Sequence, residues 1–248
     1  MNKLTHLLFG CSLGILSACA SATGTVTLDN GHYTEPQRID NLLTLSQLVT
    51  HPALPKNIWW AGAVIANQAA TEKAEQDKHR ILTRLAACKV DASPKQAVML
   101  QSVIDQLKNI KVTGRLFTPL DPDAVRSLSG ADVALEGEYQ LYTRLQPETV
   151  LLMGALSAPG PVKWQPATSA SHYLDSQERL SGADLSMATI IYPDGKTTAV
   201  PVAYWNDLHR EAVPGSIIWV GFTPCADNEA GKLLQDDIVS LLTRRVPD

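Results

Sequence analysis

The stretch TVLLMGALSAPGPVKW, Thr149–Trp164, decides how the second half of the chain folds. Its apolar run, Val150–Met153, is typical of a buried β-strand. The run breaks at Gly154 and again at Pro159–Gly160, and a strand-like pattern then resumes. Glycine tolerates positive φ and proline fixes its own φ. The stretch therefore predicts a strand that ends and a second strand that turns back sharply, which is a structural turn and not a catalytic loop.

The order of elements around this stretch repeats an order found earlier in the chain. GTVTL, Gly24–Leu28, alternates like a strand, and residues 42–54 predict a short amphipathic helix. After Thr149, a strand is again followed by a short helical pattern, over residues 169–180. Residues 187–205 predict two strands around a turn at Pro193–Gly195, and residues 214–222 predict one more. This order favours two similar small α+β units over one large sheet.

Two long helices are expected between the strands of the first unit. Residues 67–88 are rich in Ala, Glu, Lys, Gln and Leu, and a similar stretch runs from Pro94 to Lys111. Pro94 suits a first helical turn, where its missing N–H costs nothing. We expect a helical hairpin here, followed by strands near 112–121 and 137–143.

The end of the chain, residues 227–248, predicts an amphipathic helix. Its apolar residues fall at helical spacing: Leu233, Leu234, Ile238, Leu241 and Leu242. Arg244 and Arg245 are expected in the last turn, where cations complement the helix dipole. Two interpretations stay open: a helix docked on its own domain, or one whose stripe faces a partner or a membrane surface.

Residues 1–22 have the layout of a secretory signal peptide, with Lys3, an apolar stretch over 7–16 and small residues after it. The stretch is shorter than the roughly 20 residues of a membrane-spanning helix. Ordinary cleavage near Ala22 is preferred, because lipidation at Cys19 would leave little tether before the first strand. The alternative is a lipobox that ends at Cys19, which would give an acylated lipoprotein.

Composition indicates an ordinary globular product: 45% of residues are hydrophobic, 19% are charged and the formal net charge is -4. No basic block is present, which argues against a nucleic-acid partner. Cys88 and Cys225 would remain after processing, either as a disulfide in an oxidising compartment or as two buried thiols. Sequence separation does not decide between these two states.

The sequence contains no nucleophile elbow, phosphate-binding glycine loop or metal-ligand spacing, so we expect neither a cofactor nor a metal. Asp121 and Asp123 in LDPD are candidates for a glycosidase carboxylate pair, although Asp-Pro-Asp also starts turns well. Arg115, inside a predicted strand, would need a carboxylate or an anionic ligand if it faced inward, and would cover its strand if it faced outward.

The tryptophans are the other residues of interest. Some of them are candidates for sugar-stacking platforms, although Trp at strand positions is usually part of the core. They are Trp59, Trp60, Trp164, Trp205 and Trp219.

Taken together, several stretches resemble the GfcC family of capsule biosynthesis proteins, including its YjbG-like paralogues. They are GTVT, WWAGAVI, VTGRL, LDPD, GEYQLYT, LSGAD, YPDG, PVAYWN, PGSIIWVGF and the terminal IVSLLTRRVPD. Within this pattern, TVLLMGALSAPG and the later VPGSIIWVGF are similar to the soluble-ligand-binding β-grasp module (SLBB) of outer-membrane polysaccharide export proteins. Arg115 matches the family's TGR position.

The resemblance implies an α+β fold of two β-grasp (SLBB-like) domains, over residues 23–147 and 148–226. A helical hairpin at about 67–111 is inserted in the first, and an amphipathic helix over 227–248 follows the second. It also implies a periplasmic, monomeric accessory protein for assembly or export of group 4 capsule or related exopolysaccharide. Its partners would be envelope polysaccharide or the capsule export machinery, with Arg115, Asp121 and Asp123 as ligand contacts. The alternative is an enzyme that modifies the polysaccharide in a pocket around Arg115.

Overall fold

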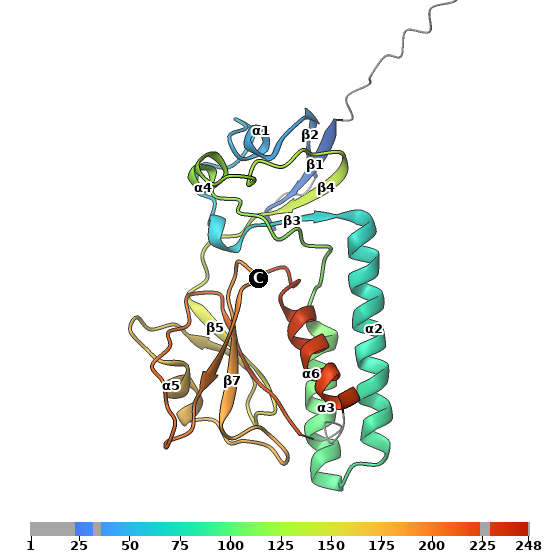
Figure 1. Ribbon diagram of the computed structural model, residues 1–248, viewed down its shortest axis with the longest axis vertical. Coiled ribbons are helices and arrows are strands. Elements are labelled where there is room, and N and C mark those ends of the chain that lie inside the picture. The colour runs from blue at the N-terminus through green and yellow to red at the C-terminus, as the bar shows by residue number, and fades with distance from the viewer. Residues whose placement is uncertain (1–22, 32–35, 224–228, 248) are drawn as a thin grey trace, which may run out of the picture.

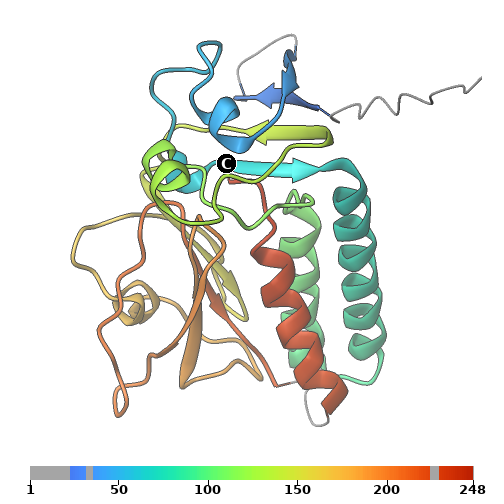
Figure 2. The same ribbon diagram turned by 45° about the horizontal axis from the view of Figure 1, so that its top comes forward.

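The computed structural model describes residues 23–31, 36–223 and 229–247. The expected signal peptide, Cys19 and Cys225 lie outside the described residues. Figure 1 shows a smaller sheet at one end of the long axis, and below it a larger sheet lying beside a layer of three helices. Figure 2 shows the same three helices running side by side.

The first sheet has the strand order β2-β1-β4-β3. Its strands are β1 (Gly24–Asp29), β2 (Gln37–Leu42), β3 (Val64–Asn67) and β4 (Gly137–Tyr142). The central strands β1 and β4 are parallel, and the two outer pairs are antiparallel. Alternate side chains of β1, Val26 and Leu28, are buried in a core that also receives Leu45 and Leu48 of α1 (Leu45–Val49).

The second sheet has the order β6-β5-β9-β7-β8. Its strands are β5 (Thr149–Gly154), β6 (Gly160–Lys163), β7 (Met187–Ile191), β8 (Thr197–Pro201) and β9 (Ile217–Val220). Its central pair, β5 and β9, is again parallel. A short helix, α5 (Ala170–Asp175), contributes to the core on one face. Each sheet thus begins with an antiparallel hairpin and places its last strand parallel to its first.

The turn expected at Gly154 is present, because β5 and β6 form an antiparallel hairpin. Gly154 has φ +102°, and a Cβ atom there would lie 2.0 Å from the carbonyl oxygen of Val220 on the neighbouring strand. No other residue fits both the backbone conformation and this close approach. The break in the apolar run is therefore required by the sheet.

The helix layer consists of α2 (Gln68–Val90), α3 (Pro94–Asn109) and α6 (Glu229–Leu242). The Asn67 side chain caps α2 by accepting a hydrogen bond from the Ala70 N–H. Ser93 and Gln96 form a capping box at the start of α3, with Pro94 in its first turn. Among the described helices, none is both long and apolar enough to cross a membrane.

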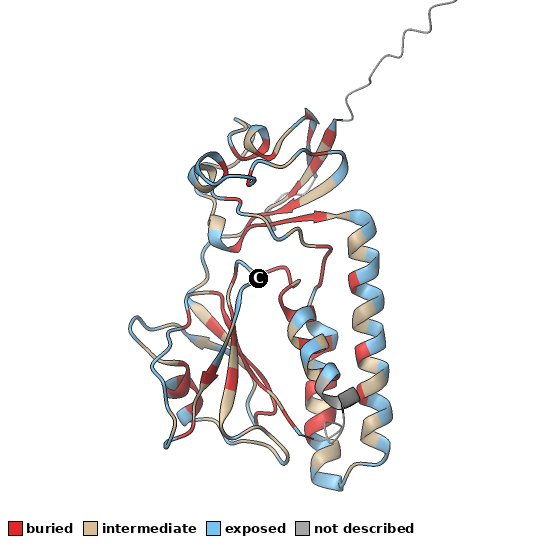
Figure 3. Cartoon of the chain, viewed as in Figure 1, coloured by how far each residue is buried: buried red, intermediate tan, exposed pale blue. Residues whose placement is uncertain are grey.

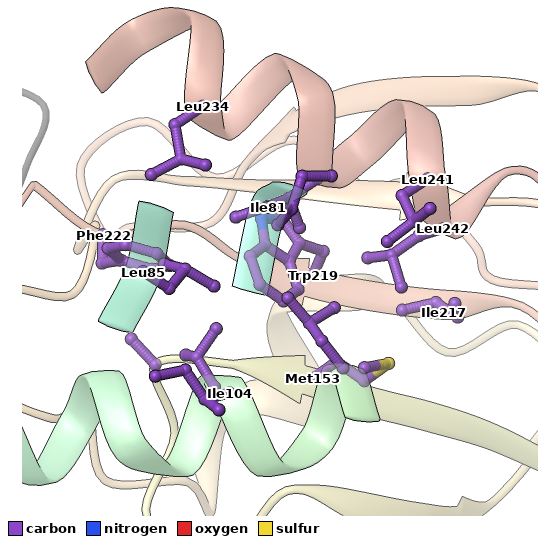
Figure 4. Packing of buried hydrophobic residues seen from close by; sticks show 14 of the residues in the cluster. Ile81, Leu85, Ile104, Met153, Ile217, Trp219, Phe222, Leu234, Leu241 and Leu242 are labelled. Atoms are coloured by element: carbon purple, nitrogen blue, oxygen red, sulfur yellow. The ribbon is translucent and has the colours of Figure 1, made fainter. Parts of the chain in front are cut away.

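Both faces of the second sheet are buried. On β9, Ile218 and Val220 point to the core shared with α5, and Ile217 and Trp219 point to the helix layer. Figure 3 shows buried residues on the sides of the helices that face the sheet. In Figure 4, Trp219 lies among Ile81 of α2, Met153 of β5 and leucines of α6. The helices inserted in the first unit therefore complete the core of the second.

Several local expectations differ from the structure. Strand β2 was not foreseen, because only Ile39 and Leu42 of its six residues are buried. The helix expected over 42–54 is limited to α1, and the turn-rich segment after Asp121 forms α4 (Pro122–Ser127).

The strand expected over 112–121 forms only isolated bridges, at Val112 and at Arg115. The reason is that this segment crosses between two partners: the Thr113 N–H donates to Arg244 near the chain end, and the Leu116 N–H donates to Ile65 on β3.

The apolar stripe of α6 packs into the protein's own core. Leu234, Ile238, Leu241 and Leu242 are at most 2% exposed, whereas Leu233 is 56% exposed. These four side chains lie against the second sheet and the helical hairpin, so this stripe faces the protein's own core. Helix α6 ends at Leu242, before Arg244 and Arg245. Arg244 instead pairs with Asp77 of α2, at 3.3 Å, and Arg245 donates to the carbonyl of Gly215.

Two neighbouring leucines test this arrangement. We expect Leu234→Ala to lower the free energy of unfolding by about 2–5 kcal/mol, because it leaves a cavity in the core. Leu233→Ala should change it by less than about 0.5 kcal/mol, because this side chain is exposed. Urea unfolding followed by far-ultraviolet circular dichroism measures both. Equal effects of the two substitutions would contradict the docked position of α6.

Candidate functional site

Arg115 lies where the first sheet, the second sheet and the end of α6 meet. Its backbone forms an antiparallel bridge with Ala66 of β3, the edge strand of the first sheet. One guanidinium nitrogen donates to the carbonyl of Pro193, at 2.8 Å, and another to that of Thr243, at 3.3 Å. Arg115 therefore ties the first sheet to the β7–β8 turn and to the residue that follows α6.

The guanidinium of Arg115 stays charged at neutral pH. Burial lowers its pKa to about 10; Asp194 opposes this shift and Arg245 adds to it. The partners of its hydrogen bonds are two backbone carbonyls, and Asp194 is paired instead with Lys196, at 2.8 Å. The Arg115 side chain therefore points inward, where it is hydrogen-bonded to backbone carbonyls.

A pocket of about 440 Å³ opens beside Arg115, between the first sheet's loops and the β7–β8 turn. Phe117, whose ring centroid lies 5.7 Å from the guanidinium carbon of Arg115, forms part of the wall and is 59% exposed. Gly195 has φ +87°, and a Cβ there would come within 2.8 Å of the Phe117 ring. The lining residues are Trp60, Ala61, residues 117–121 and residues 194–196.

The pocket combines an apolar wall with a few charged groups. Trp60 and Phe117 supply aromatic surface, and the pair Asp194–Lys196 supplies a hydrogen-bond acceptor and a donor at the rim. Aromatic faces bordered by a small number of polar groups are typical of sites that bind organic ligands in a fixed orientation. The arrangement is therefore suited to binding a polar molecule that also has apolar faces.

The two aspartates expected as ligand contacts have different positions. Asp121 lines the pocket, but its Oδ1 atom caps α4 by accepting from the N–H groups of Asp123 and Ala124, at 3.0 and 3.1 Å. The Asp123 side chain is 89% exposed and pairs with Arg126. Asp123 does not line the pocket, so the two carboxylates do not face a common substrate position as glycosidase chemistry requires.

The residues described also contain no group of three or more His, Cys, Asp or Glu side chains that could hold a metal ion. Cys88 is disulfide-bonded. Its expected partner, Cys225, falls within the undescribed segment 224–228.

The tryptophans divide into core and surface residues. Trp219 is buried, Trp164 donates its indole N–H to the Ala212 carbonyl at 2.8 Å, and Trp59 packs against Gly62 and Gly215. Trp60 lines the pocket and Trp205 is 74% exposed. Trp60 and Trp205 are both among the tryptophans that the sequence offers as sugar-stacking candidates. Phe117, Asp194 and Lys196 were missed, because only the fold brings residues 117 and 194–196 together.

Comparison with known proteins gives matches along nearly the whole chain. Residues 20–146 match the family model described as capsule biosynthesis GfcC, N-terminal, and residues 158–247 match that described as capsule biosynthesis GfcC C-terminal. The chain is also 39% identical, over 247 residues, to a protein of Escherichia coli (strain K12) described as "Uncharacterized protein YjbG". That alignment covers 100% of both chains.

The role of Arg115 as a tie can be tested by a conservative substitution. We expect Arg115→Lys to lower the free energy of unfolding by about 1–2 kcal/mol, because one ammonium group cannot reach two carbonyls that a guanidinium spans. Arg126→Lys, on an exposed ion pair, is the matched control and should have almost no effect. Urea unfolding measures both, and an unchanged stability of Arg115→Lys would refute the tie.

Proposed function

Because the chain belongs to the GfcC family of capsule biosynthesis proteins, we propose that it is a binding module in the assembly or export of group 4 capsule or a related exopolysaccharide. The observation that carries this proposal is the pocket lined by Trp60 and Phe117. Sugar rings have apolar C–H faces and polar edges, and this pocket offers aromatic faces with charged groups at the rim. Envelope polysaccharide is the ligand class that fits both the family and the pocket.

Each sheet with its short helix is interpreted as a β-grasp domain. The strand orders β2-β1-β4-β3 and β6-β5-β9-β7-β8, each with a parallel central pair, support this interpretation. Fold alone does not determine function, so the interpretation adds architecture and no chemistry.

A position in the periplasm completes the proposal. It is supported by the signal-peptide pattern of residues 1–22 and by the disulfide at Cys88, which suits an oxidising compartment. Partners in the capsule export machinery belong to the same proposal.

Binding is favoured over the enzymatic alternative. An enzyme that modifies the polysaccharide around Arg115 would need a group free to transfer a proton there. The guanidinium is engaged with two carbonyls, and the Asp121 carboxylate caps α4.

Substitution of Phe117 tests the binding site. The measurement is retention of the protein in native gels that contain envelope polysaccharide from the producing cells. We expect Phe117→Ala to raise the apparent Kd obtained from this retention by about fivefold. Stability should change little, because Phe117 is largely exposed. Val98→Ala, an exposed apolar residue on α3, is the control. Retention of Phe117→Ala equal to wild type would remove the pocket from the proposal.

The same polysaccharide distinguishes binding from catalysis. After incubation with wild-type protein, its chain length and linkages are expected to be unchanged by size-exclusion chromatography and nuclear magnetic resonance. A change that a folded Arg115→Lys protein fails to produce would overturn the binding proposal in favour of the enzyme.

The N-terminus and the disulfide can be examined by intact mass spectrometry of protein from envelope fractions. We expect a chain that starts near Thr23 and is lighter by two hydrogens before reduction. Acyl chains on Cys19 would instead identify a lipoprotein.

A further inference from the structure

A turn that follows β8 exposes two large aromatic residues to solvent. Tyr204 is 99% exposed and Trp205 is 74% exposed, the two highest values among exposed aromatic residues in the described part of the chain. Single apolar residues on a surface need no explanation, but neighbouring large ones mark interaction sites. Two adjacent large aromatic residues with this exposure are therefore a candidate interaction site.

Hydrogen bonds order the backbone that carries both rings. The Asn206 N–H donates to the Ala203 carbonyl at 2.9 Å, which makes Tyr204 and Trp205 the two central residues of a β-turn. The Asn206 side chain accepts from the Ala203 N–H at 3.0 Å and donates to the Ser186 carbonyl at 3.5 Å. Because the backbone is already ordered, binding at this turn would cost little conformational entropy.

The surroundings of the turn are apolar next to the rings and mixed in charge beyond them. Leu185 and Leu208 are 60% and 50% exposed. Both adjoin the turn, because Ser186 bonds to Asn206 and the Leu208 N–H donates to the Pro201 carbonyl. Farther along lie exposed charged groups of both signs: Asp207, Arg210 and Glu211, with His209 bonded to Glu211 at 3.1 Å.

These charges argue against a lipid surface. Contact with anionic lipids requires an excess of Lys and Arg. Here the segment has two carboxylates, Asp207 and Glu211, and one guanidinium, Arg210. Exposed carboxylates and an imidazole beside aromatic faces instead suit a ligand with many hydroxyl groups. The two aromatic side chains lie on the exposed surface, whereas small molecules are bound in concave sites. An exposed aromatic surface fits the interior of a long polymer.

The turn lies at the opposite end of β8 from the pocket. Gly195 and Lys196 precede β8 and line the pocket, and the turn follows Pro201. Five strand residues, or roughly 15 Å, separate them. Since β8 is the edge strand of its sheet, one side of this path is free of other strands in the described residues.

We infer that Tyr204 and Trp205 form a second contact for polysaccharide, a stacking platform for sugar rings within the chain whose neighbouring segment occupies the pocket. This inference rests on the proposed function and names a further site for the same class of ligand. Asn206 is a positioning residue for the platform.

The test uses full-length mature protein in native gels containing envelope polysaccharide from the producing cells, with dextran gels for comparison. Tyr204→Ala/Trp205→Ala should raise the apparent Kd by about fivefold or more. Trp205→Phe, which keeps an aromatic ring at both positions, should retain most of the wild-type binding. Asn206→Ala, which keeps both rings, should give a smaller loss. Leu145→Ala, at a 69% exposed residue in the segment between the sheets, is the control and should bind as wild type.

The outcomes separate this inference from the proposed function. If Phe117→Ala weakens retention but the double variant does not, the platform is wrong and the pocket stands. If the double variant weakens retention and Phe117→Ala does not, the platform stands and the pocket is wrong. If wild-type protein is not retained, both are wrong. Loss of flotation with phosphatidylethanolamine–phosphatidylglycerol vesicles, rather than of gel retention, in the double variant would overturn the glycan platform in favour of a lipid contact.

Discussion

The structure depends on the burial of both faces of the second sheet. One face is covered by α5 and its neighbouring loops. The other is covered by a layer of helices that come from outside residues 149–220, the segment that forms the sheet. Two helices of that layer, α2 and α3, are inserted in the first unit, and the third, α6, follows the second. Because Trp219 and Ile217 would otherwise face water, the first and second units cannot separate without exposing this core. The position of Arg115 and of the pocket beside it follows from that constraint.

Much of this architecture was predictable from local patterns. Both helices of the hairpin are rich in strong helix formers, and α3 has Ser93 as its N-cap and Pro94 in its first turn. The two helices form within a residue or two of the expected bounds. The break at Gly154 predicted the β5–β6 hairpin that the structure has. Strand β2 and the segment 112–116 were not predictable in the same way. Their hydrogen-bond partners lie on β1, on β3 and near the chain end, and no local periodicity encodes such pairing.

The candidate site could be predicted only in part. Arg115 was found because a charge inside an apolar strand pattern is unusual, and Asp121 because LDPD offered a possible carboxylate pair. The structure engages both side chains with backbone groups. Phe117 gave no signal, since a phenylalanine in an apolar stretch normally belongs to the core. The α6 stripe illustrates the converse: its periodicity was clear, and only packing could decide what it faces.

The division of one helix layer between distant parts of the chain has a consequence for biogenesis. Ribosomes make α2 and α3 well before β9 and α6, so the apolar side of the hairpin has no complete partner while the chain is being made. Closing this core requires contacts across more than a hundred residues, which Arg84 and Asp237 span with an ion pair of 2.8 Å. The nascent protein therefore passes through an interval in which it needs protection from aggregation, and that interval ends only when the last helix arrives.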